Sequence, residues 1–284
     1  MTVKKGLILE GGAMRGMFTC GVTDVLMSNN IVFDGAAGIS AGAVFGCNIK
    51  SRQSGRAIRY NKNYCKDSRY CSIRSLIKTG NFYNVDFCYG ELQDVLDPFD
   101  RETFKSNPME FYVGATDLKS GKAVYHRCSD GGVRDINWMR ASAALPFISQ
   151  PVAIDGHVLF DGGISDSVPY GFMEKKGYNR NIIVLTRPKN YRKKNNSATK
   201  VFKFLLHRYP TFSDALLRRY KVYNHQMDEI DKREKAGTSL VIRPPKSLGI
   251  SRTENNPDEL ERVYQMGRRE AERMLPKIRE FLAS

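Results

Sequence analysis

An α/β fold with a doubly wound, mostly parallel sheet sandwiched by helices is predicted for this chain of 284 residues. Short apolar runs alternate with segments of helical periodicity, and two of these runs lead directly into glycine-rich turns. Apolar residues make up 41% of the chain, which is enough to bury a large core. The length suits one α/β domain, with or without an appendage.

The expected elements alternate along the first two thirds of the chain. Strands are expected at residues 6–10, 31–37, 111–117, 122–126, 158–160 and 181–186, and helices at residues 15–27, 41–49, 89–96 and 136–145. Two longer helical patterns follow at 212–235 and 257–282, with a short strand at 239–243 between them. We therefore expect residues 5–186 to form the α/β core, and residues 187–284 to form a basic, mainly helical region that completes the same domain.

The most informative motif is GxSxG, formed by Gly38, Ser40 and Gly42 between a strand pattern and a helix pattern. In that context it predicts a nucleophile elbow, which lifts the serine hydroxyl above the edge of a sheet. A Cβ atom at either glycine would collide with neighbouring backbone, and the serine itself is expected in a strained conformation. The N-terminus of the next helix favours negative charge at the serine. The spacing alone is a weak signal, because it also arises by chance.

A glycine-rich loop follows the first predicted strand and exposes successive backbone N–H groups that an anion can occupy. It consists of Gly11, Gly12, Ala13, Met14, Arg15 and Gly16. A dinucleotide-binding loop is the alternative, and Asp34 lies near the distance at which that motif places its acidic residue. However, GxGxxG is not in register, because Ala13 occupies its third position. An oxyanion loop explains this segment and the elbow together.

The third motif is Asp161, Gly162 and Gly163, which follows the apolar run at 158–160. An aspartate at a strand end, followed by two glycines that turn the chain away, is well placed to present its carboxylate to a pocket. Taken alone, the motif also fits an ordinary turn, because Asp and Gly dominate turns.

These three motifs, in this order, resemble the patatin-like phospholipase family over roughly residues 5–185. The resemblance implies a patatin-like fold with an oxyanion loop at residues 11–16, Ser40 as the nucleophile and Asp161 as the general base of a Ser-Asp dyad. It further implies a serine acyl hydrolase of lipids, of the phospholipase A or lysophospholipase type, that needs no cofactor. Ala13 stands where the family has a third glycine, so a positive φ there would strain the alanine by about 1 kcal/mol or more. Arg15 is expected to brace the loop or attract a phosphate.

The histidines test the dyad independently. A Ser-His-Asp hydrolase of the α/β type needs a histidine after its acid in the chain. His126 and His157 precede Asp161, whereas His207 and His225 follow it, so order alone leaves a triad open. Both later histidines lie in the helix-patterned, basic C-terminal third. We therefore expect Asp161 to take the proton from Ser40 directly.

The positive charge is uneven. The net charge is +15, and residues 50–78 carry nine Lys or Arg side chains against one Asp, with Tyr60, Tyr64 and Tyr70 interleaved. Residues 187–200 carry six more cations and lead into an apolar run at 201–206. Residues 187–197 are polar and basic enough to form a linker. Three interpretations are open: a solvated surface, peripheral attachment to an anionic membrane with the first segment at the pocket mouth, and nucleic-acid binding. The last is disfavoured, because no nucleic-acid-binding motif is present.

The composition also bears on membrane-spanning, disulfide-bonded and metal-binding classes of protein. No run approaches 18 apolar residues and no hydrophobic signal core begins the chain, so a soluble cytoplasmic protein is expected. The basic segments extend this expectation to peripheral association with a membrane. Six scattered cysteines predict free thiols, and the dispersed histidines give no support for a metal site. The expected partner is a lipid substrate, while oligomeric state stays open. The alternatives are a soluble carboxylesterase or thioesterase, and a non-catalytic basic protein that binds lipid or nucleic acid.

Overall fold

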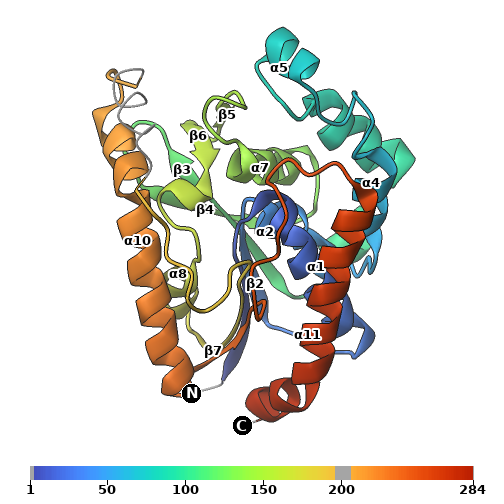
Figure 1. Cartoon of the computed structure of the whole chain (residues 1–284), viewed down its shortest axis with the longest axis vertical. Helices are drawn as coiled ribbons and strands as arrows, with labels where there is room; N and C mark the ends of the chain where they lie inside the picture. The colour runs from blue at the N-terminus through green and yellow to red at the C-terminus, as the bar shows by residue number, and fades with distance from the viewer. Residues whose placement is uncertain (1–2, 196–205, 284) are drawn as a thin grey trace.

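In the part of the chain that the structure describes, the strands form one sheet of eight (Figure 1). The computed structural model describes residues 3–195 and 206–283. The strands are β1 (Lys4–Leu9), β2 (Gly35–Ile39), β3 (Glu110–Asp117), β4 (Ala123–Cys128), β5 (Val152–Ile154), β6 (His157–Asp161), β7 (Tyr178–Val184) and β8 (Ser239–Ile242). Their order is β5–β6–β3–β2–β1–β7–β8, and β4 pairs with β3.

The pairing of the strands is mostly parallel. β1 pairs in parallel with β2 and β7, β2 with β3, and β7 with β8. Antiparallel pairs join β3 to β4 and to β6, and β5 to β6. Parallel neighbours need crossover connections, which the intervening helices supply.

The helices lie between these strands in the chain, and the last one follows β8. They are α1 (Gly16–Ser28), α2 (Ala41–Val44), α3 (Cys47–Lys50), α4 (Arg56–Tyr64), α5 (Ile73–Thr79), α6 (Arg101–Ser106), α7 (Val133–Ala143), α8 (Tyr170–Lys175), α10 (Pro210–Lys235) and α11 (Pro257–Ala283). Short 3-10 turns, η1 (Ala13–Arg15) and η3 (Gly162–Ile164), follow β1 and β6, and η2 (Phe87–Leu96) is a π-helical segment. Among the helices of the described residues, none combines the length and apolar character needed to cross a bilayer.

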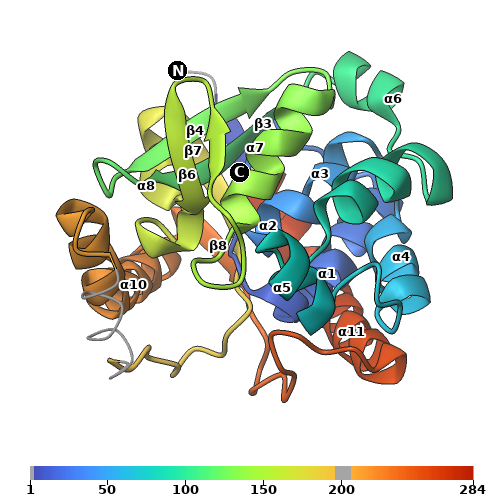
Figure 2. The ribbon, with the colours of Figure 1, turned by 90° about the horizontal axis from the view of Figure 1, so that it is seen from above.

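The alternation of side chains along the strands creates two cores. Leu7 and Leu9 of β1 face the core under α1 and α11, whereas Ile8 faces the core formed with α8 and α10. Figure 2 shows these two pairs of helices on opposite sides of the sheet. Such central strands are apolar on both faces, which is why they appear as continuous apolar runs in the sequence. The predicted doubly wound α/β fold is therefore confirmed.

Several predicted boundaries were wrong. Ile31 to Asp34 lie outside any strand and Val32 is 57% exposed, because β2 is built from the small residues of Gly35–Ile39. The helix expected at 41–49 is divided into α2 and α3. Helices α4, α5, α6 and α8 and strand β5 were not predicted. Helices α4 and α5 were missed because residues 50–78 are rich in Lys and Arg, so the helical spacing of their apolar residues was not recognised.

The C-terminal region contacts the same sheet. β8 extends it next to β7, in register from Asn181 opposite Ser239 to Val184 opposite Ile242. Helix α11 packs along α1, far from it in the sequence (Figure 1). The division of the chain at residue 186 stays a prediction, and the apolar run at 201–206 lies outside the described residues except for Leu206.

Candidate active site

Ser40 lies on a sharp turn between β2 and α2. Its backbone has φ 54° and ψ −121°, which is a region that costs an L-residue of order 1–3 kcal/mol. A Cβ atom on Gly38 would lie 2.2 Å from the carbonyl oxygen of Gly42, and one on Gly42 would lie 2.3 Å from that of Leu9. Both glycines are therefore needed for backbone segments to pass this closely. The geometry is that of the predicted elbow, with its strand starting at Gly35 rather than Ile31.

Asp161 lies beside this turn because of how β2 and β6 pair with β3. The last residue of β2, Ile39, is opposite Gly114, and the last residue of β6, Asp161, is opposite the next residue, Ala115. Because β2 is parallel to β3 and β6 is antiparallel to it, the C-terminal ends of both strands meet at adjacent positions of β3. The side chains of Ser40 and Asp161 are joined there by a hydrogen bond.

The carboxylate of Asp161 is almost completely buried, with 2% of the residue exposed. Burial raises its pKa above the ordinary range of aspartate, and Arg219, the hydrogen bond with Ser40 and the N–H of Gly163 partly oppose that rise. The Gly163 N–H donates to Asp161 Oδ1 at 2.7 Å. Gly162 lies beneath the site, where a Cβ atom would be 2.3 Å from the carbonyl oxygen of Gly114.

The glycine-rich loop also reaches Ser40. A Cβ atom on Gly11 would lie 2.9 Å from the Cβ of Ser40, so the two segments are in direct contact. Ala13 has φ 49°, the left-handed conformation in which the sequence predicted strain for an alanine. Gly12 and Arg15 line a cavity with Ser40.

The two remaining loop residues lie elsewhere. Met14 lines a second cavity. Gly16 begins α1 and packs against Ala41 and Phe45, so it lies behind the loop and outside both cavities.

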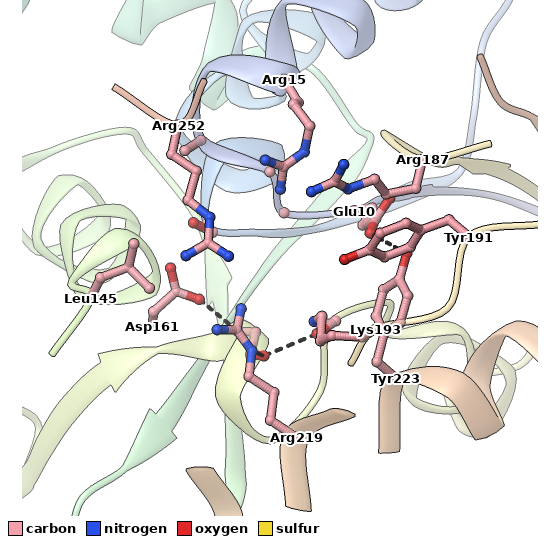
Figure 3. A pocket seen from close by; sticks show the side chains of 16 residues that line it. Glu10, Arg15, Leu145, Asp161, Arg187, Tyr191, Lys193, Arg219, Tyr223 and Arg252 are labelled. Carbon is pink, nitrogen blue, oxygen red and sulfur yellow. Dashed lines mark hydrogen bonds between the residues drawn. The ribbon is translucent and has the colours of Figure 1, made fainter. Parts of the chain in front are cut away.

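Ser40, Ala13 and Leu145 line both cavities, so the serine lies where the two meet. One cavity has a volume of about 560 Å³, partly open to solvent, and polar walls that include Arg15, Arg187, Lys193, Arg219 and Arg252. Figure 3 shows these side chains approaching from different segments of the chain. We call this space the basic cavity.

The second space, which we call the apolar cavity, has a volume of about 1000 Å³, again partly open to solvent. Its walls include Val44, Phe45, Tyr60, Tyr70, Tyr83 and Leu92. Tyr60 and Tyr70 are buried, so neither side chain is available to an outer surface, whether solvent or membrane covers it. Lys50 and Arg56 of the same segment are also buried and donate hydrogen bonds to backbone carbonyls of residues 107, 109 and 97.

Residues 187–195, which the sequence suggested as a linker, form a wall of the basic cavity. Lys193 and Asn224 of α10 exchange two hydrogen bonds, of 2.8 and 3.1 Å, through the Lys193 backbone. The Lys193 ammonium lies 4.0 Å from the centre of the Tyr223 ring, and the Arg187 guanidinium lies 4.3 Å from that of Tyr191. Aromatic faces of this kind stabilise cations at short range.

Three residues of the site carried no motif in the sequence. Glu10 ends the run before the glycine-rich loop and accepts hydrogen bonds from Thr186 and, at 2.9 Å, from the Tyr223 hydroxyl. Arg219 donates to the carbonyl oxygen of Gly163 at 2.6 Å. Arg252 lines the basic cavity from the segment before α11. Among these three, only the position of Glu10 at the end of a predicted strand was a usable signal.

None of the described residues lining either cavity is a histidine. His126 contacts Asp135 at 2.7 Å, and His157 contacts Asp117 at 3.0 Å. The donor atoms of His126, Cys128 and Asp135 lie within 4.8 Å of one another. However, Asp135 already accepts three backbone N–H groups of residues 129–131, so its carboxylate holds a loop in place.

Comparisons with known proteins agree with the motifs. A family described as patatin-like phospholipase matches residues 7–173, and a domain of unknown function (DUF6363) matches residues 209–283. The uncharacterized protein YjjU of Escherichia coli (strain K12) is 29% identical over 199 residues, which is 64% of this chain and 52% of YjjU. Lysophospholipase nte1 of Emericella nidulans is 28% identical over 174 residues, 61% of this chain and 11% of that protein.

The chain therefore spans about half of YjjU and about a tenth of lysophospholipase nte1. Among solved structures, VipD from Legionella pneumophila aligns over 97% of this chain and 67% of its own, with 14% identity and a TM-score of 0.49.

Proposed function

The chain belongs to the patatin-like phospholipase family, and we propose that it is a serine hydrolase that cleaves carboxylic esters of lipids. The observation that carries this proposal is the position of Ser40 at the junction of the basic and apolar cavities, hydrogen-bonded to the buried Asp161. An amphipathic ester fits that junction, with its acyl chain in the apolar cavity and its polar group in the basic one.

In the proposed first step, Asp161 accepts the proton of the Ser40 hydroxyl as its oxygen attacks the ester carbonyl. The backbone N–H groups of Gly12 and Ala13, together with Met14, stabilise the oxyanion, and a single such donor contributes about 10² to 10³ in rate. The tetrahedral intermediate then collapses, the leaving alcohol takes the proton from Asp161, and the acyl group stays on Ser40.

In the second step, Asp161 takes a proton from water, which attacks the acyl-serine ester. Collapse of this second intermediate releases the fatty acid and returns the proton to Ser40. A carboxylate is a weaker base than an imidazole, so burial that raises the pKa of Asp161 favours proton transfer in both steps.

Peripheral binding to an anionic membrane is part of the proposal. Ile73 and Ile77 of α5 are 70% and 79% exposed, and Arg74 and Lys78 between and beside them are exposed cations. Residues on both sides of α5, Tyr70 and Tyr83 among them, line the apolar cavity. Figure 1 shows α5 projecting from the body of the molecule. This combination of apolar and cationic side chains suits a membrane interface at the cavity mouth.

A fluorophosphonate probe tests the hydrolase directly. The wild type, Ser40→Ala and Asp161→Asn are incubated with the probe, and Ser106→Ala on the exposed surface of α6 is the matched control. The same four proteins are assayed with short-chain p-nitrophenyl esters and with anionic phospholipid vesicles. Labelling and lipid release that require Ser40 and Asp161 but not Ser106 support the proposal.

The other outcomes select among the alternatives. Ser40-dependent labelling and ester hydrolysis without lipid release would indicate a soluble carboxylesterase or thioesterase. Absence of both labelling and turnover would overturn the hydrolase assignment in favour of a non-catalytic protein that binds lipid or nucleic acid.

A further inference from the structure

Among the described residues, five basic side chains converge on the basic cavity from separate parts of the chain. Arg15 comes from the glycine-rich loop, Arg187 and Lys193 from the segment after β7, Arg219 from α10 and Arg252 from the segment before α11 (Figure 3). Glu10 and Asp161 are the acidic residues among the described residues lining the same space. The cavity therefore has a surplus of positive charge immediately beside Ser40.

The two carboxylates do not neutralise these cations by direct pairing. Glu10 accepts hydrogen bonds from the Thr186 hydroxyl at 3.0 Å and the Tyr223 hydroxyl at 2.9 Å. Asp161 accepts a hydrogen bond from the Gly163 N–H and forms another with the Ser40 side chain. Within the described residues, none of the ion pairs of 4.0 Å or less involves any of the five cations.

One donor of this cluster has no partner in the part of the chain that the structure describes. The Nε atom of Arg15 is buried and has no hydrogen-bond partner among the described residues. Burial and the neighbouring Arg187 lower the pKa of Arg15 to about 10, and burial and Arg219 lower the pKa of Lys193 to about 6. At neutral pH the positive charge of the cavity therefore comes from its four arginines. Like charges held this closely repel one another, and an anion bound among them would offset that repulsion.

We propose that the basic cavity binds the phosphate of an acyl substrate whose headgroup is a phosphomonoester. The inference rests on the proposed function, since it names the substrate class of the same site. Guanidinium groups bind phosphate oxygens through paired N–H donors, and the surplus of cations matches a dianion better than a monoanion. A choline headgroup would place its quaternary ammonium next to Arg187 and Arg252, where like charges repel.

The position of Ser40 links this phosphate to the reaction. The basic cavity contains Ser40, Gly12 and Ala13 together with the cations, so headgroup and scissile ester occupy one continuous space. The acyl chain extends the other way, into the apolar cavity. The cationic walls therefore position the substrate, and they distinguish it from esters of the same acyl chain without phosphate.

Calorimetric titration of the Ser40→Ala protein tests the headgroup without requiring turnover. The ligands are octanoyl lysophosphatidic acid, octanoyl lysophosphatidylcholine, mono-octanoylglycerol and inorganic phosphate, at about pH 8, where a phosphomonoester carries nearly two charges. We expect the lysophosphatidic acid to bind about tenfold to a hundredfold more tightly than the other two lipids, as for one or two charge-assisted hydrogen bonds.

Substitutions of the cavity arginines test which side chains cause the preference for lysophosphatidic acid. Arg187→Gln and Arg252→Gln, each in the Ser40→Ala background, should reduce the ratio of affinities for lysophosphatidic acid over mono-octanoylglycerol by about tenfold. Arg273→Gln removes the same charge from the exposed surface of α11, outside the cavity, and is the matched control. An equal affinity for all three lipids, or a ratio that Arg187→Gln and Arg252→Gln leave unchanged, would overturn the inference.

Inorganic phosphate and the fluorophosphonate probe complete the test. Inorganic phosphate that binds as tightly as lysophosphatidic acid would assign the cavity to free phosphate and overturn the lipid headgroup. Failure of the probe to label Ser40 in the wild type would refute the hydrolase, whereas a lost headgroup preference with intact labelling would refute only the phosphomonoester assignment.

Discussion

The hydroxyl of Ser142, on α7, accepts the backbone N–H of Ser40 at 2.8 Å and donates to the carbonyl oxygen of Gly114 at 2.6 Å. It thereby connects the strained residue of the elbow to the point on β3 where β2 ends. Ser142 lies outside both cavities, so its role is to hold Ser40 in position.

Replacing Ser142 should therefore affect both stability and reactivity. Ser142→Ala leaves a buried N–H and a buried carbonyl without this partner, and we expect it to lower the free energy of unfolding by about 1–3 kcal/mol. Labelling of Ser40 by the fluorophosphonate probe should slow as the elbow loosens. Ser213→Ala is the matched control, because Ser213 is also buried but its hydroxyl has no partner among the described residues. Equal losses in both variants would show that the Ser142 bonds are unimportant.

The strain at Ser40 predicts a difference between two inactive variants. Both Ser40→Ala and Ser40→Gly remove the hydroxyl, but only glycine adopts φ 54° and ψ −121° at little cost. We expect Ser40→Gly to exceed Ser40→Ala in thermal stability by about 1 kcal/mol, measured by differential scanning calorimetry. If alanine were as stable as glycine there, the elbow would not be strained.

Ala13 provides the same test in the glycine-rich loop. Ala13→Gly relieves the left-handed conformation at φ 49°, so it should be neutral or stabilising by about 1 kcal/mol. Ala43→Gly, within buried α2, should instead destabilise by about 0.5–1 kcal/mol, because glycine loses more backbone entropy there. Chemical denaturation of the two variants gives the comparison, and a clear loss of stability in Ala13→Gly would contradict the strain argument.

The acid limb of the pH–rate profile should follow the ionisation of the Asp161 carboxyl group. A general base must be ionised, so activity falls as the pH decreases through the pKa of Asp161. Burial raises that pKa, and the charge of Arg219 lowers it again. Arg219→Gln should therefore move the acid limb of kcat/KM to higher pH. Arg218→Gln, an exposed neighbour on α10, is the control, and identical acid limbs in the two variants would exclude this coupling.

The membrane proposal predicts a role for α5. Ile77→Ser should weaken cosedimentation with anionic vesicles by about tenfold or more, because a buried Ile contributes about 1.5–3 kcal/mol. Lys78→Gln should weaken it less, by about 1 kcal/mol, and only at low salt. Val133→Ser is the control, since Val133 is 77% exposed at the start of α7. Equal binding to neutral and anionic vesicles would remove charge as the cause.

The local geometry of the site could be predicted from the sequence. Gly38 and Gly42 permit only a tight turn around Ser40, and the apolar run at 158–160 ends at Asp161. The strain predicted for Ala13 is present in its positive φ. Each of these features depends on atoms within a few residues or on a recognisable motif. Their catalytic roles remain proposals.

The walls of the two cavities could not be predicted in this way. Arg219 and Arg252 had no motif, and Tyr60 and Tyr70 lay in a segment interpreted through its charge. The segment after β7 was expected to be a linker, yet Lys193 and Arg187 line the site.

The α/β class, the elbow, the glycine-rich loop and the aspartate turn all follow from local sequence, because steric limits on short backbone segments depend on their own residues. The meeting of Ser40 and Asp161 at adjacent positions of β3 depends on the folded chain, as does the arrival of arginines from α10 and from the segment before α11 at one cavity. These contacts join residues far apart in the chain. They depend on the register of the strands and on the packing of helices over the whole sheet.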